Sequence, residues 1–155
     1  MIKINLDGCK SFVAEETMKD YVGRARRALQ TLDSGKGAGA EFTGWNELPQ
    51  ETSPELVGEC IEVVDKWVSK EVDLVVCIGI GGSYLGAKAA IEALSHTFAS
   101  KLESNGPSVV FAGNNLSEEY AAELKDLMAV KNVAAVVISK SGTTTEPAVA
   151  FRIVK

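Results

Sequence analysis

Short apolar runs in the second half of the chain predict three strands. The first, "LVVCI", is continuous and rich in β-branched residues, which is typical of a strand buried on both faces of a sheet. Two further runs of similar length and composition follow it. The three predicted strands are Leu74–Ile78, Ser108–Gly113 and Val133–Ser139.

A helical pattern follows each of these strands. Helices are expected from about Tyr84 to Leu94, from Ser117 towards Met128, and from Pro147 onward. Strands that alternate with helices predict an α/β fold, a doubly wound parallel sheet between two helical layers. Ligands of such sheets bind beyond the carboxyl ends of the strands. The polar turns after the first and third strands therefore fall where a site is expected.

Two amphipathic helices are predicted ahead of the sheet. Apolar residues, Met18 among them, recur at helical spacing between residues 15 and 32. Ser53 and Pro54 are typical N-cap and first residues of a second helix, whose apolar stripe includes Trp67. We expect Met18 and Trp67 to belong to the core.

The chain is accordingly divided into two predicted parts. Residues 1–70 form a helical segment that packs on the sheet, and residues 71–155 form the first part of the sheet domain. The glycine-rich connection Asp33–Trp45 contains "SGKG", but no strand precedes it, so it is interpreted as a surface turn. The final "AVAFRIVK" contains only the first turns of a helix without a cap, which favours a chain truncated at its C-terminus.

Composition and charge narrow the class of protein. The chain has 155 residues and a net charge of -5, with acids and bases interleaved and no basic block, which argues against nucleic acid and anionic membranes as partners. The cysteines Cys9, Cys60 and Cys77 lack metal-ligand spacing and are interpreted as buried or semi-buried free thiols. The N-terminus lacks the apolar region of a signal peptide, and no apolar run reaches transmembrane length. We expect a cytoplasmic protein.

The first polar turn, "GIGGS" at residues 79–83, resembles two phosphate-binding motifs without matching either. The dinucleotide fingerprint requires a third glycine where Tyr84 stands, and no acidic residue closes the second strand to hold a ribose. The nucleotide P-loop requires a Lys-Ser or Lys-Thr pair directly after its second glycine, where this chain has Ala87 and Lys88.

The first turn nevertheless has the properties of an anion site. Gly81 and Gly82 allow the backbone to approach a ligand closely, and Ser83 falls at a helix N-terminus, where free N–H groups favour an anion. The alternative is a tight strand-to-helix turn without a ligand.

The second polar turn, "SKSGTTTEP", concentrates hydroxyl groups before a helix. Such a loop suits a phosphomonoester, because hydroxyls and backbone N–H groups donate hydrogen bonds and the helix dipole adds partial positive charge. Lys140 could point at the phosphate or into solvent, and one of the three threonines could serve only as a helix cap. Glu146 is interpreted as a first-turn acid rather than a catalyst. The hydroxyl-bearing residues are Ser139, Ser141, Thr143, Thr144 and Thr145.

Together, "IGIGGSYLGAKA" and "ISKSGTTTEPAVAFR" resemble the phosphoglucose isomerase family. The tyrosine in the first motif, the Ser-Gly form of the second and the segment "GWNELP" (Gly44–Pro49) are similar to its bacterial branch. The resemblance covers most of the chain. It implies a sugar-isomerase (SIS) domain and a sugar phosphate as the partner. The implied substrate-binding residues are Gly82, Ser83, Ser139, Lys140, Ser141, Gly142, Thr143 and Thr144.

The resemblance also implies a reaction and a place for its catalytic groups. The family interconverts glucose 6-phosphate and fructose 6-phosphate in glycolysis and gluconeogenesis, without metal or cofactor, as a homodimer. A glutamate moves a proton between C2 and C1 through an enediol intermediate. The family's Gly-Gly-Arg signature, its catalytic glutamate segment and its terminal lysine motif belong beyond Lys155. His96, the only histidine, is expected at the end of a helix away from the ligand edge, so no catalytic residue is assigned here.

Two other functions are weighed against the isomerase. SIS domains also serve as non-catalytic sugar-phosphate sensors in regulators, but the N-terminal helices here carry too little basic charge for a DNA-binding module. A Rossmann-type dehydrogenase is disfavoured by the imperfect dinucleotide motif.

Overall fold

The computed structural model describes residues 3–99, 102 and 106–155 and divides the chain into two units, Met1–Val57 and Gly58–Lys155. The described secondary structure of the first unit is helical, and its last helix, α3 (Pro54–Ser69), continues into the second unit. In the described ranges no helix is both long and apolar enough to cross a membrane. Up to α3 the elements are η1 (Asp7–Cys9), α1 (Glu15–Asp33), η2 (Ala40–Phe42), η3 (Gly44–Asn46), α2 (Leu48–Glu51) and α3 (Pro54–Ser69).

The start of α3 matches the prediction. Leu56 N–H donates a hydrogen bond to the Ser53 hydroxyl at 3.2 Å, so Ser53 satisfies one of the free N–H groups of the first turn. Pro54, which lacks an N–H, is the first residue of α3.

The prediction that Met18 and Trp67 belong to the core is wrong for the described residues. Neither α1 nor α3 contains a buried residue, and Met18 and Trp67 are only partly buried. Cys9 and Cys60 are exposed, whereas Cys77 alone is buried as expected. Helical periodicity shows which face of a helix is apolar, but it does not supply the element that covers that face. The packing of residues 1–70 on the sheet stays a prediction.

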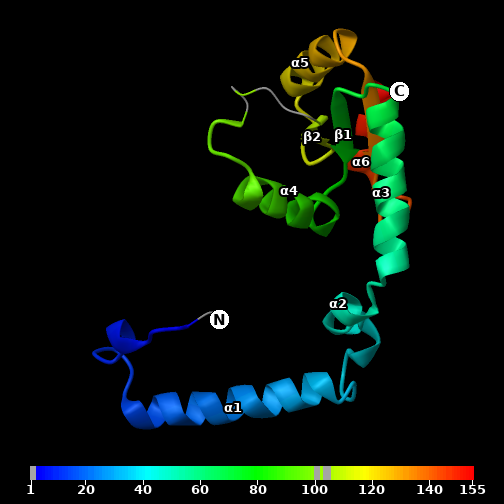
Figure 1. Ribbon diagram of the computed structural model, residues 1–155. Coiled ribbons are helices and arrows are strands. Elements are labelled where there is room, and N and C mark those ends of the chain that lie inside the picture. Colours follow the sequence, from blue (N-terminus) through cyan, green and yellow to red (C-terminus); the bar gives the residue numbers. More distant parts are fainter. Residues whose placement is uncertain (1–2, 100–101, 103–105) are drawn as a thin grey trace. The chain divides into compact units, whose positions relative to one another are not determined.

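The second unit is built around a parallel sheet of three strands (Figure 1), in the order β2-β1-β3. Ile78, the last residue of β1, lies opposite the last residues of both neighbours, Ala112 and Val137. The strands therefore end level with one another, and the loops that follow them share one edge. The strands are β1 (Leu74–Ile78), β2 (Ser108–Ala112) and β3 (Val133–Val137).

Helices cover both faces of the sheet, as the alternating pattern predicts. Successive residues of a strand point to opposite faces. On one face Leu74, Val76 and Ile78 pack with Leu124 of α5 and Ala150 of α6 in the buried core. On the other, the ring of Tyr84 of α4 lies 5.8 Å from that of Phe111. These helices are α4 (Gly82–Leu94), α5 (Glu118–Ala129) and α6 (Thr145–Val154).

The predicted element boundaries differ from the structure at the two polar turns. The bounds of β1 are as predicted, but β3 ends at Val137 rather than Ser139, and α4 begins at Gly82 rather than Tyr84. Helix α6 begins two residues before Pro147, which is possible because residues in the first helical turn need no N–H. Sequence patterns locate apolar residues well, whereas the polar residues at these ends carry no periodic signal.

Candidate functional site

The two predicted loops open onto one hollow at the carboxyl edge of the sheet. The hollow has a volume of about 290 Å³ and lies between the turn after β1 and the turn after β3. Register brings the two turns together, because β1 and β3 are adjacent and end at the same level. Its lining residues are Ile80, Gly82, Ser83, Ile138, Ser139, Lys140, Thr144 and Pro147.

The first loop presents a helix N-terminus to this hollow. Gly81 precedes α4 with φ of 56° and ψ of -128°, a conformation that glycine adopts far more readily than other residues. The N–H groups of Ser83 and Tyr84 donate to the carbonyls of Ile80 and Gly81 at 3.1 and 3.2 Å. The N–H of Gly82 has no hydrogen-bond partner among the described residues and is free to bind an anion.

The second loop is held in shape by its own hydroxyl groups. The N–H of Gly142 donates to the Ser139 hydroxyl at 3.0 Å, which closes a tight turn that needs positive φ at Gly142, 70° here. Thr143 donates to the Ser141 hydroxyl twice, from its N–H at 3.2 Å and from its own hydroxyl at 3.0 Å. The Ser141 and Thr144 hydroxyl oxygens lie 3.3 Å apart. These bonds give the exposed turn a defined geometry before any ligand binds.

The beginning of α6 also leaves donors free. Thr144 is the N-cap residue, but its side chain makes no capping hydrogen bond and instead lines the hollow. In the portion of the chain that the structure describes, the N–H groups of Thr145 and Glu146 have no acceptor. Pro147, the third residue of α6, has no N–H. The free donors of this helix are therefore concentrated in its first two residues.

The structure places the predicted site residues in three ways. Gly82, Ser83, Ser139, Lys140 and Thr144 line the hollow. Ser141 does not line the hollow but lies within 3.3 Å of the Thr144 hydroxyl, and Gly142 and Thr143 shape the turn without lining the hollow. Sequence reasoning missed the apolar part of the lining, made by Ile80, Ile138 and Pro147. The only signal for them is their position: Ile80 lies within the predicted first turn, Ile138 near the end of the predicted third strand, and Pro147 at the predicted start of a helix.

The charged groups near the hollow are few. Lys140 lines it, has an exposed side chain and forms no ion pair within the described residues. Glu146 lies in the first turn of α6, as predicted. His96 lies beyond the end of α4, where its ring accepts a hydrogen bond from the N–H of Phe98 at 3.0 Å. It is not among the lining residues.

This arrangement suits binding of an anion rather than proton transfer. Two helix N-termini, serine and threonine hydroxyls and one lysine are the groups that recognise a phosphate. Among the lining residues Lys140 is the only titratable one, so the hollow supplies neither a carboxylate nor an imidazole as a general base.

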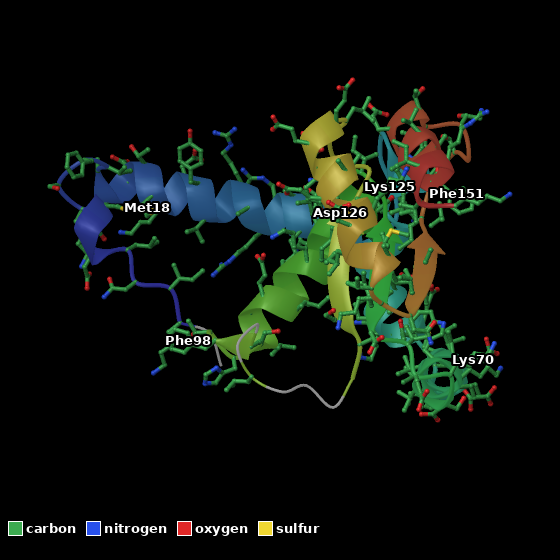
Figure 2. The ribbon with its side chains drawn as sticks, turned by 90° about the horizontal axis from the view of Figure 1, so that it is seen from above. Met18, Lys70, Phe98, Lys125, Asp126 and Phe151 are labelled. Atoms are coloured by element: carbon green, nitrogen blue, oxygen red, sulfur yellow. The ribbon has the colours of Figure 1, made fainter. Side chains whose placement is uncertain are left out.

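A larger hollow of about 470 Å³ lies between α5 and α6. Figure 2 marks these helices by Lys125 and Asp126 on α5 and by Phe151 on α6. Its lining is mainly apolar, and it includes neither of the two turns. The smaller hollow, by contrast, is lined by both turns and by residues at the starts of α4 and α6.

Comparison with known proteins gives consistent matches. The family model described as "Phosphoglucose isomerase" matches residues 59–153. The glucose-6-phosphate isomerases of Staphylococcus aureus strains Newman, Mu3 and COL are each 45% identical to this chain over 157 residues. Each match covers 100% of this chain but 35% of the relative. The chain thus spans about a third of the length of the curated relatives it matches.

Proposed function

The chain belongs to the phosphoglucose isomerase family, and from this premise we propose that it supplies the phosphosugar-binding loops of a glucose-6-phosphate isomerase. The observation that carries the proposal is the convergence of two helix N-termini and a hydroxyl-rich turn on one hollow. The relatives named as glucose-6-phosphate isomerases match the whole of this chain, which supports the same substrate class.

In the proposed complex the phosphate of the sugar binds at the turn after β3. The hydroxyls of Ser139, Ser141 and Thr144 donate to the phosphate oxygens, as do the free N–H groups at the start of α6. Gly142 and Thr143 hold the turn, and Lys140 adds positive charge. Gly82 and Ser83, across the hollow, contact the sugar.

The reaction proposed for the whole protein is the reversible isomerisation of glucose 6-phosphate to fructose 6-phosphate. A proton is removed from C2 and returned to C1, and the C1 carbonyl is reduced as the C2 hydroxyl is oxidised. That transfer needs a base within hydrogen-bond reach of both carbons. The residues lining the hollow provide binding but no such base. We therefore propose that the catalytic groups lie outside this chain.

We further propose that the protein is cytoplasmic and that the full-length enzyme is a homodimer. The three free cysteines suit a reducing compartment. Helix α3 carries large apolar side chains on one face that are nearly half exposed, among them Leu56 at 49% and Val63 at 43%. Such a stripe needs a partner surface, which the remainder of the protein or a second subunit would supply.

The binding proposal is tested by titrating the chain with glucose 6-phosphate, fructose 6-phosphate and glucose, followed by calorimetry. We expect both sugar phosphates to bind and glucose to bind far more weakly, because the phosphate makes the charge-assisted contacts. Thr144→Val removes a lining hydroxyl that caps no helix. It should weaken sugar-phosphate binding roughly three- to tenfold, the effect of one lost hydrogen bond, without lowering the melting temperature.

The matched control is Thr17→Val, which removes an exposed α1 hydroxyl that makes no hydrogen bond within the described residues. It should leave binding unchanged. Equal affinity for glucose and its 6-phosphate, or no binding of either, would contradict the proposal. A coupled assay should detect no isomerisation by this chain, and measurable turnover would show that catalytic groups are present after all.

A further inference from the structure

Gly79 occupies a position that the proposed binding residues depend on, although it does not line the hollow itself. It is buried, directly follows β1, and its N–H donates to the carbonyl of Ala112 at 3.0 Å. The carboxyl end of β1 is thereby tied to the end of β2. Gly79 is therefore held to the sheet by a hydrogen bond, although it belongs to the turn in sequence.

Helix α4 approaches Gly79 so closely that a side chain at this position would require Ser83 to shift. A Cβ atom at this position would lie 3.0 Å from the Cβ of Ser83, 3.2 Å from its carbonyl oxygen and 3.3 Å from its carbonyl carbon. The φ angle of Gly79 lies outside the left-handed region, so backbone conformation does not require glycine here. The three atoms that such a Cβ would meet most closely all belong to Ser83.

The first turn of α4 is held from a second direction by an aromatic contact. The Tyr84 ring, next to Ser83, lies 5.8 Å from the ring of Phe111 on β2. Ser83 thus contacts Gly79, while Tyr84 packs against Phe111 of β2. Both contacts fix the distance between the first turn of α4 and the sheet. They therefore also fix the position of the free N–H of Gly82.

We propose that Gly79 is a positioning residue for the sugar-phosphate site and acts through Ser83. Because Gly79 has no side chain, the first turn of α4 lies close enough to the sheet for Gly82 and Ser83 to face the turn after β3. The inference rests on the proposed function, since it takes the hollow to be the place where the phosphosugar binds. A methyl group at position 79 would displace Ser83 by a few tenths of an ångström and widen the hollow.

The experiment compares Gly79→Ala with Gly86→Ala in the full chain. Gly86 lies on the same helix, and a Cβ there would meet nothing within 4 Å. For each variant, amide and Cβ resonances are recorded, and glucose 6-phosphate affinity and the melting temperature are measured. We expect Gly79→Ala to shift the resonances of Gly82, Ser83 and Tyr84 and to weaken binding roughly three- to tenfold, the loss of about one hydrogen bond. Gly86→Ala should leave binding unchanged.

A double-mutant cycle separates positioning from a general loss of stability. Ser83→Gly removes the Cβ that a methyl group at position 79 would meet most closely. If Gly79 acts through Ser83, the loss of affinity caused by Gly79→Ala should be clearly smaller in the Ser83→Gly background. If Gly79 matters for a reason unrelated to Ser83, the loss should be the same in both backgrounds, and an unchanged melting temperature of Gly79→Ala excludes a general loss of stability as the cause.

The outcomes distinguish this inference from the proposed function. If the parent chain binds glucose 6-phosphate and Gly79→Ala binds it equally well, the positioning role is overturned while the proposed function stands. Unshifted Ser83 resonances in Gly79→Ala overturn the positioning role whatever the affinity. If the parent chain binds no sugar phosphate, the proposed function fails, and the positioning role for its site fails with it.

Discussion

At the scale of single residues, burial decides which thiol is chemically available. Cys77 lies in β1 and is 7% exposed, whereas Cys9 and Cys60 are exposed. Burial raises the pKa of the Cys77 thiol, because desolvation penalises the charged thiolate more than the neutral thiol. The thiolate is the reactive form, so Cys77 needs a higher pH than an exposed cysteine to react. Its burial also shields the thiol from reagents in the solvent.

We predict that iodoacetamide modifies Cys9 and Cys60 well before Cys77 in the native chain. The difference should persist as the pH rises through the ordinary range of cysteine titration, because the raised pKa of Cys77 leaves a smaller fraction of it as thiolate at each pH and its burial shields it. Peptide-resolved mass spectrometry over a pH series measures the three rates, and unfolding in urea serves as the control that should equalise them. Native modification of Cys77 at the rate of Cys60 would contradict this prediction.

At the scale of elements, a polar cluster fixes the amino-terminal edge of the sheet. The Asn132 side chain donates to the carbonyls of Lys70 and Glu71 at 2.6 and 3.1 Å, while its backbone N–H donates to the Asp73 carboxylate at 3.0 Å. The carbonyl of Asp73 in turn accepts the N–H of Ser108 at 2.9 Å. The end of α3 and the starts of all three strands are thus joined by a few short-range bonds.

Replacing Asn132 with alanine should lower the free energy of unfolding by about 1–2 kcal/mol, because two backbone carbonyls lose their donor. Chemical denaturation followed by circular dichroism measures the change. The control is Lys131→Ala, which alters the neighbouring exposed residue and should stay within about 0.5 kcal/mol. Equal stability of the two variants would show that water replaces the lost side-chain bonds at no cost.

At the scale of the whole molecule, the described sheet has two open edges. Strand β3 pairs only with β1 in the described part of the chain, and its sequence, "VAAVV", is wholly apolar. Val137 is 44% exposed at its end. An apolar, unpaired strand edge is a template for pairing with another chain, so the isolated chain is expected to self-associate.

We predict that Val137→Lys reduces this self-association, because a charge on an edge strand opposes strand addition. Sedimentation velocity should show a smaller fraction of oligomer, with an unchanged circular dichroism spectrum. Val130→Lys is a matched control, because Val130 is 77% exposed but lies at the end of α5 and outside the sheet. The same reduction in both variants would point to net charge rather than to the strand edge.

The order of the elements in the sheet domain could be predicted well from the sequence. Short apolar runs and helical periodicity locate each strand of the described residues and the helix that follows it, and the predicted bounds of β1 are those observed. The register of the strands, the level carboxyl edge and the order β2-β1-β3 could not be predicted, because they depend on pairing between segments distant in sequence.

The sequence by itself determined the chemistry available to this protein. It provides glycines where the backbone must bend or approach closely, hydroxyls in one turn, and motifs specific enough to indicate a family. Only the tertiary structure decided which of these groups share a hollow. It directed the side chain of Thr144, the N-cap residue of α6, to the hollow without a capping hydrogen bond, and it brought Ser83 into close contact with Gly79. The physical reason is that residue type fixes what a group can donate or accept, whereas the packing of helices on strands fixes where that group lies.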